Sequence, residues 1–213
     1  MHHTRLHHVK RLISEGEHQH LDFKFEISDA AKIARSLVAF ANTDGGTLLI
    51  GVKDNGSLKG IQSGEELYMV QRASKNFCQP EVVFASKEWI LEGKKILEVK
   101  VPVSKQLPHR APDTQGNYKV FVRIHDQNMM ASGIQMKIWK KQQSDEAVQI
   151  TYNQQVKELL SLVESQPGLG INELKAKLNV SKHKLEELLA DLIVMKVIQI
   201  GRTGNELVFQ LCE

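Results

Sequence analysis

The chain has 213 residues, of which 41% are hydrophobic and 25% charged, which is enough to bury one core of ordinary size and a second, smaller one. Its net charge of +3 and pI near 8.8 are too mild to indicate nucleic-acid binding by themselves. No apolar run approaches the roughly 20 residues that cross a bilayer, and the first residues lack the apolar core of a signal peptide, so we expect a cytoplasmic protein without membrane contact.

The first predicted elements are a short entry helix and a strand. Apolar residues recur at near-helical spacing within the first 16 residues, which predicts the helix. In the next segment, aromatic and charged residues alternate. This pattern predicts a strand with Phe23 and Phe25 on its core face and with Asp22 and Lys24 together on its polar face.

A helix from Asp29 to Ala41 follows, and Ser28 is its expected N-cap. Its apolar residues fall on one face, as in a helix that packs on a core. Lys32 and Arg35 lie on the outer face, where they are either solvated or in contact with phosphate.

A glycine-containing turn connects this helix to a buried strand from Thr47 to Val52. Because glycine has no Cβ, it can adopt a positive φ and let backbone or a ligand approach closely. The turn is therefore either a tight helix-to-strand connection or a ligand loop. Its residues are Asn42, Thr43, Asp44, Gly45 and Gly46.

The remainder of the first domain continues to alternate between strands and helices. Asp54-Asn-Gly-Ser is a hairpin-type turn signal. It precedes a helix from Gly64 to Phe77 and a hairpin of strands between Glu81 and Val103.

An extended, exposed loop then carries His109 and Arg110, and a strand from Tyr118 to His125 carries Arg123. A short helix ends at Lys141. This order predicts an α+β fold, with helices packed on a mixed sheet, over residues 1–141.

Residues 142–149 are polar and are predicted to be a linker to a second domain, residues 150–213. Three helical patterns are followed there by a hairpin, an order that resembles the winged-helix domains of bacterial transcription factors. In that geometry the third helix enters the major groove with its N-terminal side chains, here Lys182, His183 and Lys184. Arg202 on the hairpin can reach phosphate or the minor groove.

Acidic residues on the third helix oppose this interpretation. Glu186, Glu187 and Asp191 follow the basic residues, and the residues after Glu146 carry slightly more acidic than basic side chains. Dimer formation, or packing on the first domain, is therefore the alternative role for this helix.

Several motifs of the first domain together resemble the AlbA_2 domain of Schlafen proteins and of many bacterial proteins of regulator type. They are Glu17-His-Gln-His-Leu-Asp-Phe-Lys24, the Ala-Phe-Ala-Asn-Thr-Asp-Gly-Gly segment that ends at Gly46, Ile50-Gly-Val52, Pro108-His-Arg-Ala-Pro112 and Tyr118-Lys-Val-Phe-Val-Arg-Ile124. The resemblance covers roughly residues 10 to 140, and Asp22 stands where the family usually has Glu. It implies an AlbA_2-like domain that binds nucleic acid or another ligand.

The resemblance also implies a second possible activity, because some Schlafen proteins are metal-dependent RNA nucleases. By motif position the acidic residues that bind the metal are Glu17 and Asp22, with Asp54 as the third. Carboxylates suit Mg²⁺ or Mn²⁺, and Lys24 can neutralise a phosphate. A spacing of five places Glu17 and Asp22 on opposite faces of a continuous strand, so the chain from Gly16 has to bend.

ATP binding is a weaker alternative. The family has been described as a divergent ATPase, but the Gly-x-x-x-x-Gly-Lys-Ser/Thr loop is absent from the sequence. A protein-interaction module remains open as well.

Our interpretation is a DNA-binding transcriptional regulator that acts as a homodimer, with RNA as a further possible partner and no certain cofactor. The residues assigned to nucleic-acid contact are Lys24, Lys32, Arg35, His109, Arg110, Arg123, Lys182, His183, Lys184 and Arg202.

Overall fold

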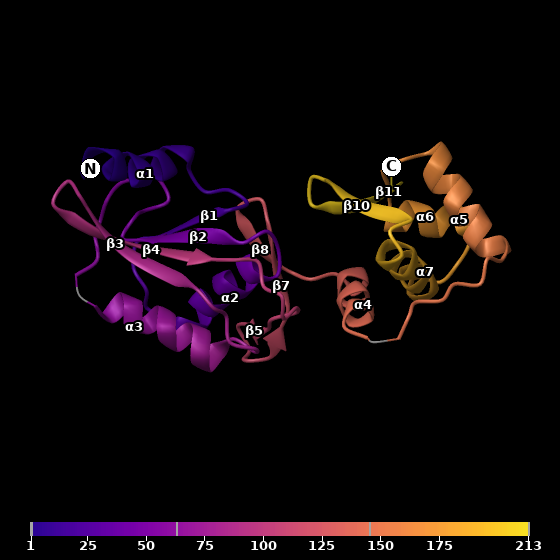
Figure 1. Cartoon of the computed structure of the whole chain (residues 1–213), viewed down its shortest axis with the longest axis horizontal. Helices are drawn as coiled ribbons and strands as arrows, with labels where there is room; N and C mark the ends of the chain where they lie inside the picture. The colour runs from indigo at the N-terminus through magenta and orange to yellow at the C-terminus, as the bar shows by residue number, and fades with distance from the viewer. Residues whose placement is uncertain (1, 63, 145, 213) are drawn as a thin grey trace. The chain divides into compact units, whose positions relative to one another are not determined.

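The structure, a computed structural model, describes residues 2–62, 64–144 and 146–212. The chain divides into two compact units, Met1–Met130 and Ala131–Glu213 (Figure 1). Helices and mixed strands occur in both units, so the predicted α+β class is confirmed. None of the described helices is long and apolar enough to cross a membrane.

The first unit is built on a four-stranded sheet of order β1-β2-β4-β3. β1 and β2 are parallel, whereas β4 is antiparallel to both of its neighbours. The elements of this unit are α1 (His2–Glu15), β1 (Leu21–Lys24), α2 (Ala30–Ala41), β2 (Gly46–Ile50), α3 (Glu65–Arg72), a π-helical turn (Ala73–Phe77), β3 (Ala85–Leu91), β4 (Lys94–Val101), β5 (Ala111–Pro112), β6 (Tyr118–Lys119), β7 (Phe121–Ile124) and β8 (Gln127–Met130).

Helices cover both faces of this sheet, with α2 and α3 on one side and α1 on the other (Figure 1). Alternation along β2 assigns its residues to the two cores. Leu48 and Ile50 are buried with α2, whereas Leu49 is buried with Val9 of α1. The central strand is therefore apolar on both faces, as expected of a strand between two helical layers.

The strand predicted from Tyr118 to His125 is divided into two. β6 pairs with β5, and β7 forms a separate antiparallel ribbon with β8. The preceding loop is also less exposed than predicted, because β5 is buried beneath α2 and Arg35 Nη1 donates to Pro112 O at 3.2 Å.

Two local predictions just before α2 were wrong. Asp29, not Ser28, caps the helix, because its carboxylate accepts from Ala31 N at 2.8 Å while its backbone stays extended. Phe25 does not face the core but is 44% exposed, because β1 ends at Lys24 and the alternation ends with it.

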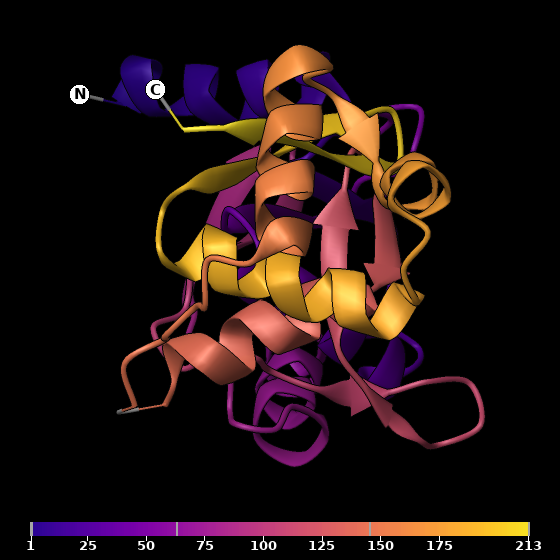
Figure 2. The ribbon, with the colours of Figure 1, turned by 90° about the vertical axis from the view of Figure 1, so that its right-hand side faces the viewer.

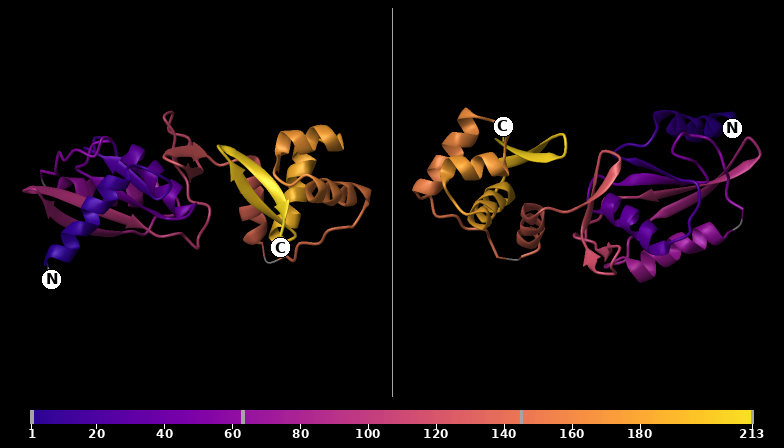
Figure 3. Two further views of the ribbon diagram at one scale, coloured as in Figure 1. Left: turned by 90° about the horizontal axis from the view of Figure 1, so that it is seen from above. Right: turned by 180° about the vertical axis from the view of Figure 1, so that it is seen from behind.

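The second unit consists of helices and a β-hairpin (Figures 2 and 3). Its short strand β9 pairs with the hairpin strand β11. The elements are α4 (Gly133–Gln142), α5 (Gln154–Ser165), β9 (Leu169–Gly170), α6 (Ile171–Leu178), α7 (Lys182–Val194), β10 (Ile198–Thr203) and β11 (Glu206–Leu211).

Helix α4, which we expected to complete the first domain, packs in the second unit. Ile134 and Ile138 are buried there in one cluster with Leu159 of α5 and Leu185 of α7. Figure 2 shows α4 running beside α7. The predicted end of the first domain, Lys141, therefore lies beyond the observed division of the chain.

Candidate functional site

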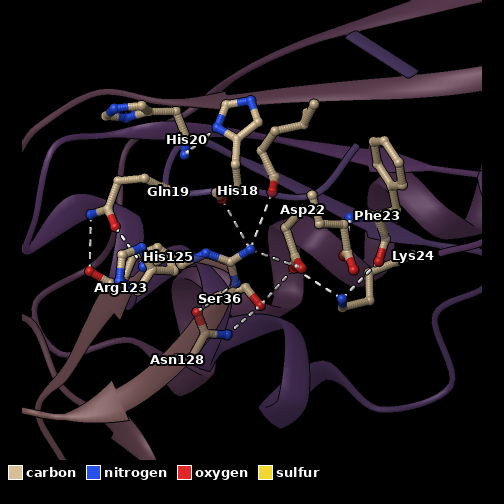
Figure 4. Close-up of polar contacts among 12 residues, drawn as sticks. His18, Gln19, His20, Asp22, Phe23, Lys24, Ser36, Arg123, His125 and Asn128 are labelled. Atoms are coloured by element: carbon tan, nitrogen blue, oxygen red, sulfur yellow. Dashed lines mark hydrogen bonds and ion pairs between the residues drawn. The ribbon is translucent and has the colours of Figure 1, made fainter. Parts of the chain in front are cut away.

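A buried polar network joins β1, α2 and the β7–β8 ribbon (Figure 4). Arg123 of β7 is 1% exposed, and its Nη2 lies 3.4 Å from Asp22 Oδ1. Ser36 Oγ donates to the other Asp22 oxygen at 3.2 Å, and Asn128 joins Ser36 to Arg123 through bonds of 2.9 and 3.1 Å. Lys24 Nζ lies 2.9 Å from Asp22 Oδ2, so two cations neutralise one carboxylate.

Arg123 is also bound to the backbone that leads into β1. Its Nη2 donates to Leu21 O at 3.1 Å and to His18 O at 3.4 Å, and its guanidinium lies 5.2 Å from the centre of the Phe40 ring. Within the part of the chain that the structure describes, its Nε has no hydrogen-bond partner. Burying a guanidinium is costly, and the contacts to Asp22 and to two carbonyls offset part of that cost.

The prediction that Arg123 contacts nucleic acid does not fit this placement. Contact with nucleic acid requires an accessible side chain, but all four residues of β7 are buried. Asp22 was likewise placed on a polar face, yet it is 3% exposed. Asp22 and Lys24 do share a face, as predicted, but it is an interior one.

Glu17 lies beside Asp22 because the chain bends between them. Gly16 has a φ of +71°, and His18 and Leu21 exchange two backbone hydrogen bonds across a tight turn. Glu17 Oε1 accepts from Phe23 N at 2.8 Å. Burial, and then a hydrogen bond with Asp22, raise the pKa of Glu17 above its ordinary value. The bend that the spacing of five required is therefore present.

Asp54 is not part of this acidic pair. It lies exposed in the turn that Lys53 N closes by donating to Ser57 O at 3.0 Å. Among the described residues, no group of three or more His, Cys, Asp or Glu is arranged to hold a metal ion. Asp22 already accepts from Lys24, Ser36 and Arg123, so this donor set does not fit a divalent cation as it is folded here.

The Asn42 side chain connects three segments of the first unit. Its Nδ2 donates to His109 O at 2.9 Å and to Phe121 O at 2.8 Å, and its Oδ1 accepts from His109 N at 2.8 Å. Thr43 Oγ1 donates to Ala39 O and accepts from Arg123 N at 2.9 Å. Both side chains therefore satisfy buried backbone groups, which supports a structural role for the turn.

The two glycines of this turn are required by close contacts, one with backbone and one with an aromatic ring. Gly45 has a φ of +70°, and a Cβ there would lie 2.8 Å from Val101 O. A Cβ on Gly46 would lie 2.3 Å from the ring of Phe40. Asp44 is exposed and accepts from Gln19 Nε2 at 3.0 Å.

His109 was predicted to lie on an exposed loop but is 2% exposed. Its ring nitrogens lie 2.8 Å from Pro80 O and 2.7 Å from Ser104 Oγ, and burial lowers its pKa. Arg110 and Lys32 are exposed, as predicted. His109 was misplaced because the Asn42 contacts that bury it join residues far apart in the chain.

In the second unit, the first turn of α7 presents basic side chains. Lys182, His183 and Lys184 are exposed, and Ser181 caps the helix by accepting from Lys184 N at 3.3 Å. Arg202 is exposed on β10.

The acidic residues of α7 are directed toward α4. Lys137 and Lys141 both pair with Glu187, the latter at 3.1 Å, and Lys141 Nζ lies 2.8 Å from Asp191 Oδ1. The hydrogen bond from Lys137 lowers the pKa of Glu187, and the one to Asp191 raises the pKa of Lys141. Glu186 is buried at the first turn of α4, where a Cβ on Gly133 would lie 2.9 Å from its carboxylate oxygens.

Sequence reasoning missed Ser36 and Asn128, which complete the Asp22 network. It also missed the lysines of α4 that pair with α7. Neither set has a spacing signal, because the partners are far apart in the sequence.

The fold and the site define an α+β unit that is organised around a buried Asp–Arg pair and an Asn-Thr-Asp-Gly-Gly turn. Residues 17–132 match the family model described as Schlafen, AlbA_2, and the chain belongs to this family. No curated protein matches the sequence.

Solved structures of low similarity are also found. The DIP2311 protein from Corynebacterium diphtheriae has 18% identity and a TM-score of 0.47 over 81% of this chain, which spans only 32% of that protein. The N-terminal domain of a RecG-related protein from Nitrosomonas europaea has 20% identity and a TM-score of 0.39, covering 67% of this chain and 94% of that one. The adhesin competence repressor AdcR from Streptococcus pyogenes has 21% identity and a TM-score of 0.28, covering 37% of this chain and 57% of that one.

Proposed function

We propose that this protein binds nucleic acid and that its second unit is a winged helix which binds DNA as a homodimer to regulate transcription. The observation that carries the proposal is the separation of charge on α7. Lys182, His183 and Lys184 are exposed at its start, while its acidic residues lie against α4 or are buried.

This separation answers the main objection to DNA binding that the sequence raised, which is the presence of acidic residues on α7. An unpaired Glu187 or Asp191 on a DNA-facing helix would repel phosphate. Lys137 and Lys141 of α4 neutralise both carboxylates. The start of α7 is therefore left with basic donors, and the helix dipole adds partial positive charge there.

The order of elements is the second support. α5, α6 and α7 precede the β10–β11 hairpin, and β9 adds a short third strand to it. In a winged helix the third helix lies in the major groove and the hairpin contacts the backbone. Arg202 on β10 is then placed to reach phosphate.

The test is a mobility shift of labelled duplex DNA with the full chain at several salt concentrations. Combined Lys182→Ala and Lys184→Ala substitutions should weaken binding at every sequence. The slope of log K against log salt concentration should become less steep by about 0.9 per lost phosphate contact. The matched control is Lys175→Ala with Lys177→Ala, because it removes the same charge from exposed positions on α6. Equal effects of the two pairs would refute the assigned surface.

The same assay distinguishes the nuclease alternative. Structured RNA is incubated with the protein, with and without Mn²⁺, and its integrity is followed. Metal-dependent fragments that disappear in Asp22→Asn would move the function to the first unit. Sedimentation of the complex on a two-fold site tests the homodimer, since a dimer should span both half-sites.

A further inference from the structure

One end of the sheet in the first unit combines exposed cations with an aromatic ring on the face that α1 only partly covers. Alternation and register place Lys87 and Trp89 of β3 on this face, together with Glu98 and Lys100 of β4. His8 of α1 reaches the same face, because its Nε2 donates to Glu98 Oε1 at 2.9 Å. His8 precedes the range that the family model matches.

Glu98 is the fixed centre of this cluster. It is 3% exposed, and its Oε2 accepts from Trp89 Nε1 at 2.7 Å. Burial opposes its ionisation, but the bonds from His8 and Trp89 and the charge of Lys100 outweigh burial and lower its pKa. The only carboxylate of the cluster, as far as the described residues show, is therefore ionised, bonded and turned inward, so its negative charge is not presented to a ligand.

Trp89 and the two lysines border an open hollow of about 520 Å³. Lys87 Nζ lies 3.9 Å from the centre of the Trp89 ring, and the centre of the His8 ring lies 5.7 Å from it. Lys87 and Lys100 are exposed. Ala85, opposite Lys100 in the register, contributes only a methyl group to the wall and leaves the hollow open.

We propose that this surface binds single-stranded nucleic acid, with one base stacked on Trp89 and the adjoining phosphates held by Lys87 and Lys100. Base–aromatic stacking beside a cationic groove is the chemistry with which proteins bind single strands without reading their sequence. The Lys87 ammonium occupies the ring face in the free protein and swings to a phosphate when a base replaces it.

Charge and shape favour this ligand over the alternatives. A duplex keeps its bases stacked inside, so it can use the lysines but not the Trp89 ring. An acidic peptide can pair with the lysines but supplies no flat group for the ring. The proposal concerns the first unit and is independent of DNA binding by α7.

The sequence has two tryptophans, which gives a direct measurement. Trp139 lies on α4, so the full chain with Trp139→Phe reports Trp89 alone. An oligothymidylate of about ten nucleotides should quench Trp89 fluorescence saturably. Unchanged emission at saturating oligonucleotide would overturn the proposal.

Affinity variants in the otherwise unchanged chain keep the test independent of Trp139→Phe. Lys87→Ala with Lys100→Ala should weaken oligonucleotide binding about tenfold and lower its salt dependence by about 0.7 per phosphate contact. Lys95→Ala is the matched control, because Lys95 lies on the opposite face of β4 and pairs with Glu88 at 3.5 Å. Equal affinities of the double variant and the control would refute the site.

Two further outcomes are decisive. A polyglutamate peptide that quenches Trp89 in place of the oligonucleotide would reassign the surface to acidic peptides and overturn the proposal. Lys182→Ala with Lys184→Ala should lose duplex binding but keep the Trp89 response. Loss of both responses would show that the oligonucleotide binds at α7 and not here.

Discussion

The two units use charged side chains in different ways. In the first unit Arg123 and Asp22 are buried and bonded to strands far apart in sequence, so their charges hold the fold together. In the second unit Lys137, Lys141 and Glu187 remain partly exposed, and their pairing leaves the start of α7 basic. A charged residue in this chain indicates a binding surface only where its partners leave it accessible.

The largest effect should follow from breaking the buried pair. Arg123→Met removes one of the two cations that neutralise Asp22 and leaves two backbone carbonyls without their donor. We therefore expect a loss of about 3–5 kcal/mol in the stability of the first unit. Denaturant unfolding followed by Trp89, in the Trp139→Phe chain, measures it.

Adding Asp22→Asn to Arg123→Met provides the control for the buried pair. The double variant removes the uncompensated carboxylate, so it should recover part of the loss. A double variant no more stable than Arg123→Met would show that the pairing of the two charges is not the source of the effect.

The sequence was informative where local patterns decide the structure. A run of apolar residues predicted β2, strand-like patterns predicted the β3–β4 hairpin, and glycines marked the turn at Gly45. Side chains that bond across long separations were not predictable: Arg123 and His109 looked like surface cations because nothing in their neighbourhood shows that they are buried.

The candidate site was predicted only in part, because a motif identifies residues that are close in the sequence but not their distant partners. Glu17 and Asp22 were identified by their motif, and the bend that joins them was anticipated. Their Ser36 and Asn128 partners were not. Packing of α4 on α7 was missed because the pattern of α4 shows an apolar face but not the core that it joins.

A smaller loss is expected when the connection made by Asn42 is removed. Asn42→Ala leaves two carbonyls and one N–H without their partner in a buried position, which should cost about 2–3 kcal/mol. The same Trp89 unfolding assay applies. Asn55→Ala is a control on an exposed turn and should change stability by less than about 0.5 kcal/mol.

The ion pairs between α4 and α7 should contribute less, because their side chains are partly solvated. Glu187 has a lower pKa in the folded chain than its ordinary value of 4.5, so its ion pairs stabilise the fold fully above pH 4.5. This stabilisation is lost as the pH falls through the lower pKa of the folded chain. Glu187→Gln should therefore cost about 0.5 kcal/mol at pH 7 and nothing at strongly acidic pH. Unfolding followed by Trp139 in a Trp89→Phe chain measures the second unit. An unchanged stability at pH 7 would contradict the pairing.

Glu17→Gln should change stability least, and it should raise stability where the preceding substitutions lower it. The pKa of Glu17 is higher in the folded chain than its ordinary value of 4.5. Stability therefore falls as the pH rises from 4.5 through the pKa of the folded chain. Gln retains an oxygen for Phe23 N and offers a donor to Asp22, so it resembles the protonated form. We expect the variant to be more stable than the parent by a few tenths of a kcal/mol at pH 7, after solvent screening.

The pH dependence of that difference is the decisive measurement. The gain should shrink toward zero near pH 4, because the parent is then protonated as well. Glu15→Gln, on the exposed end of α1, is the matched control and should show no such gain. A Glu17→Gln chain that is less stable than the parent at every pH would show that the Glu17 carboxylate is held ionised by Lys24 rather than protonated against Asp22.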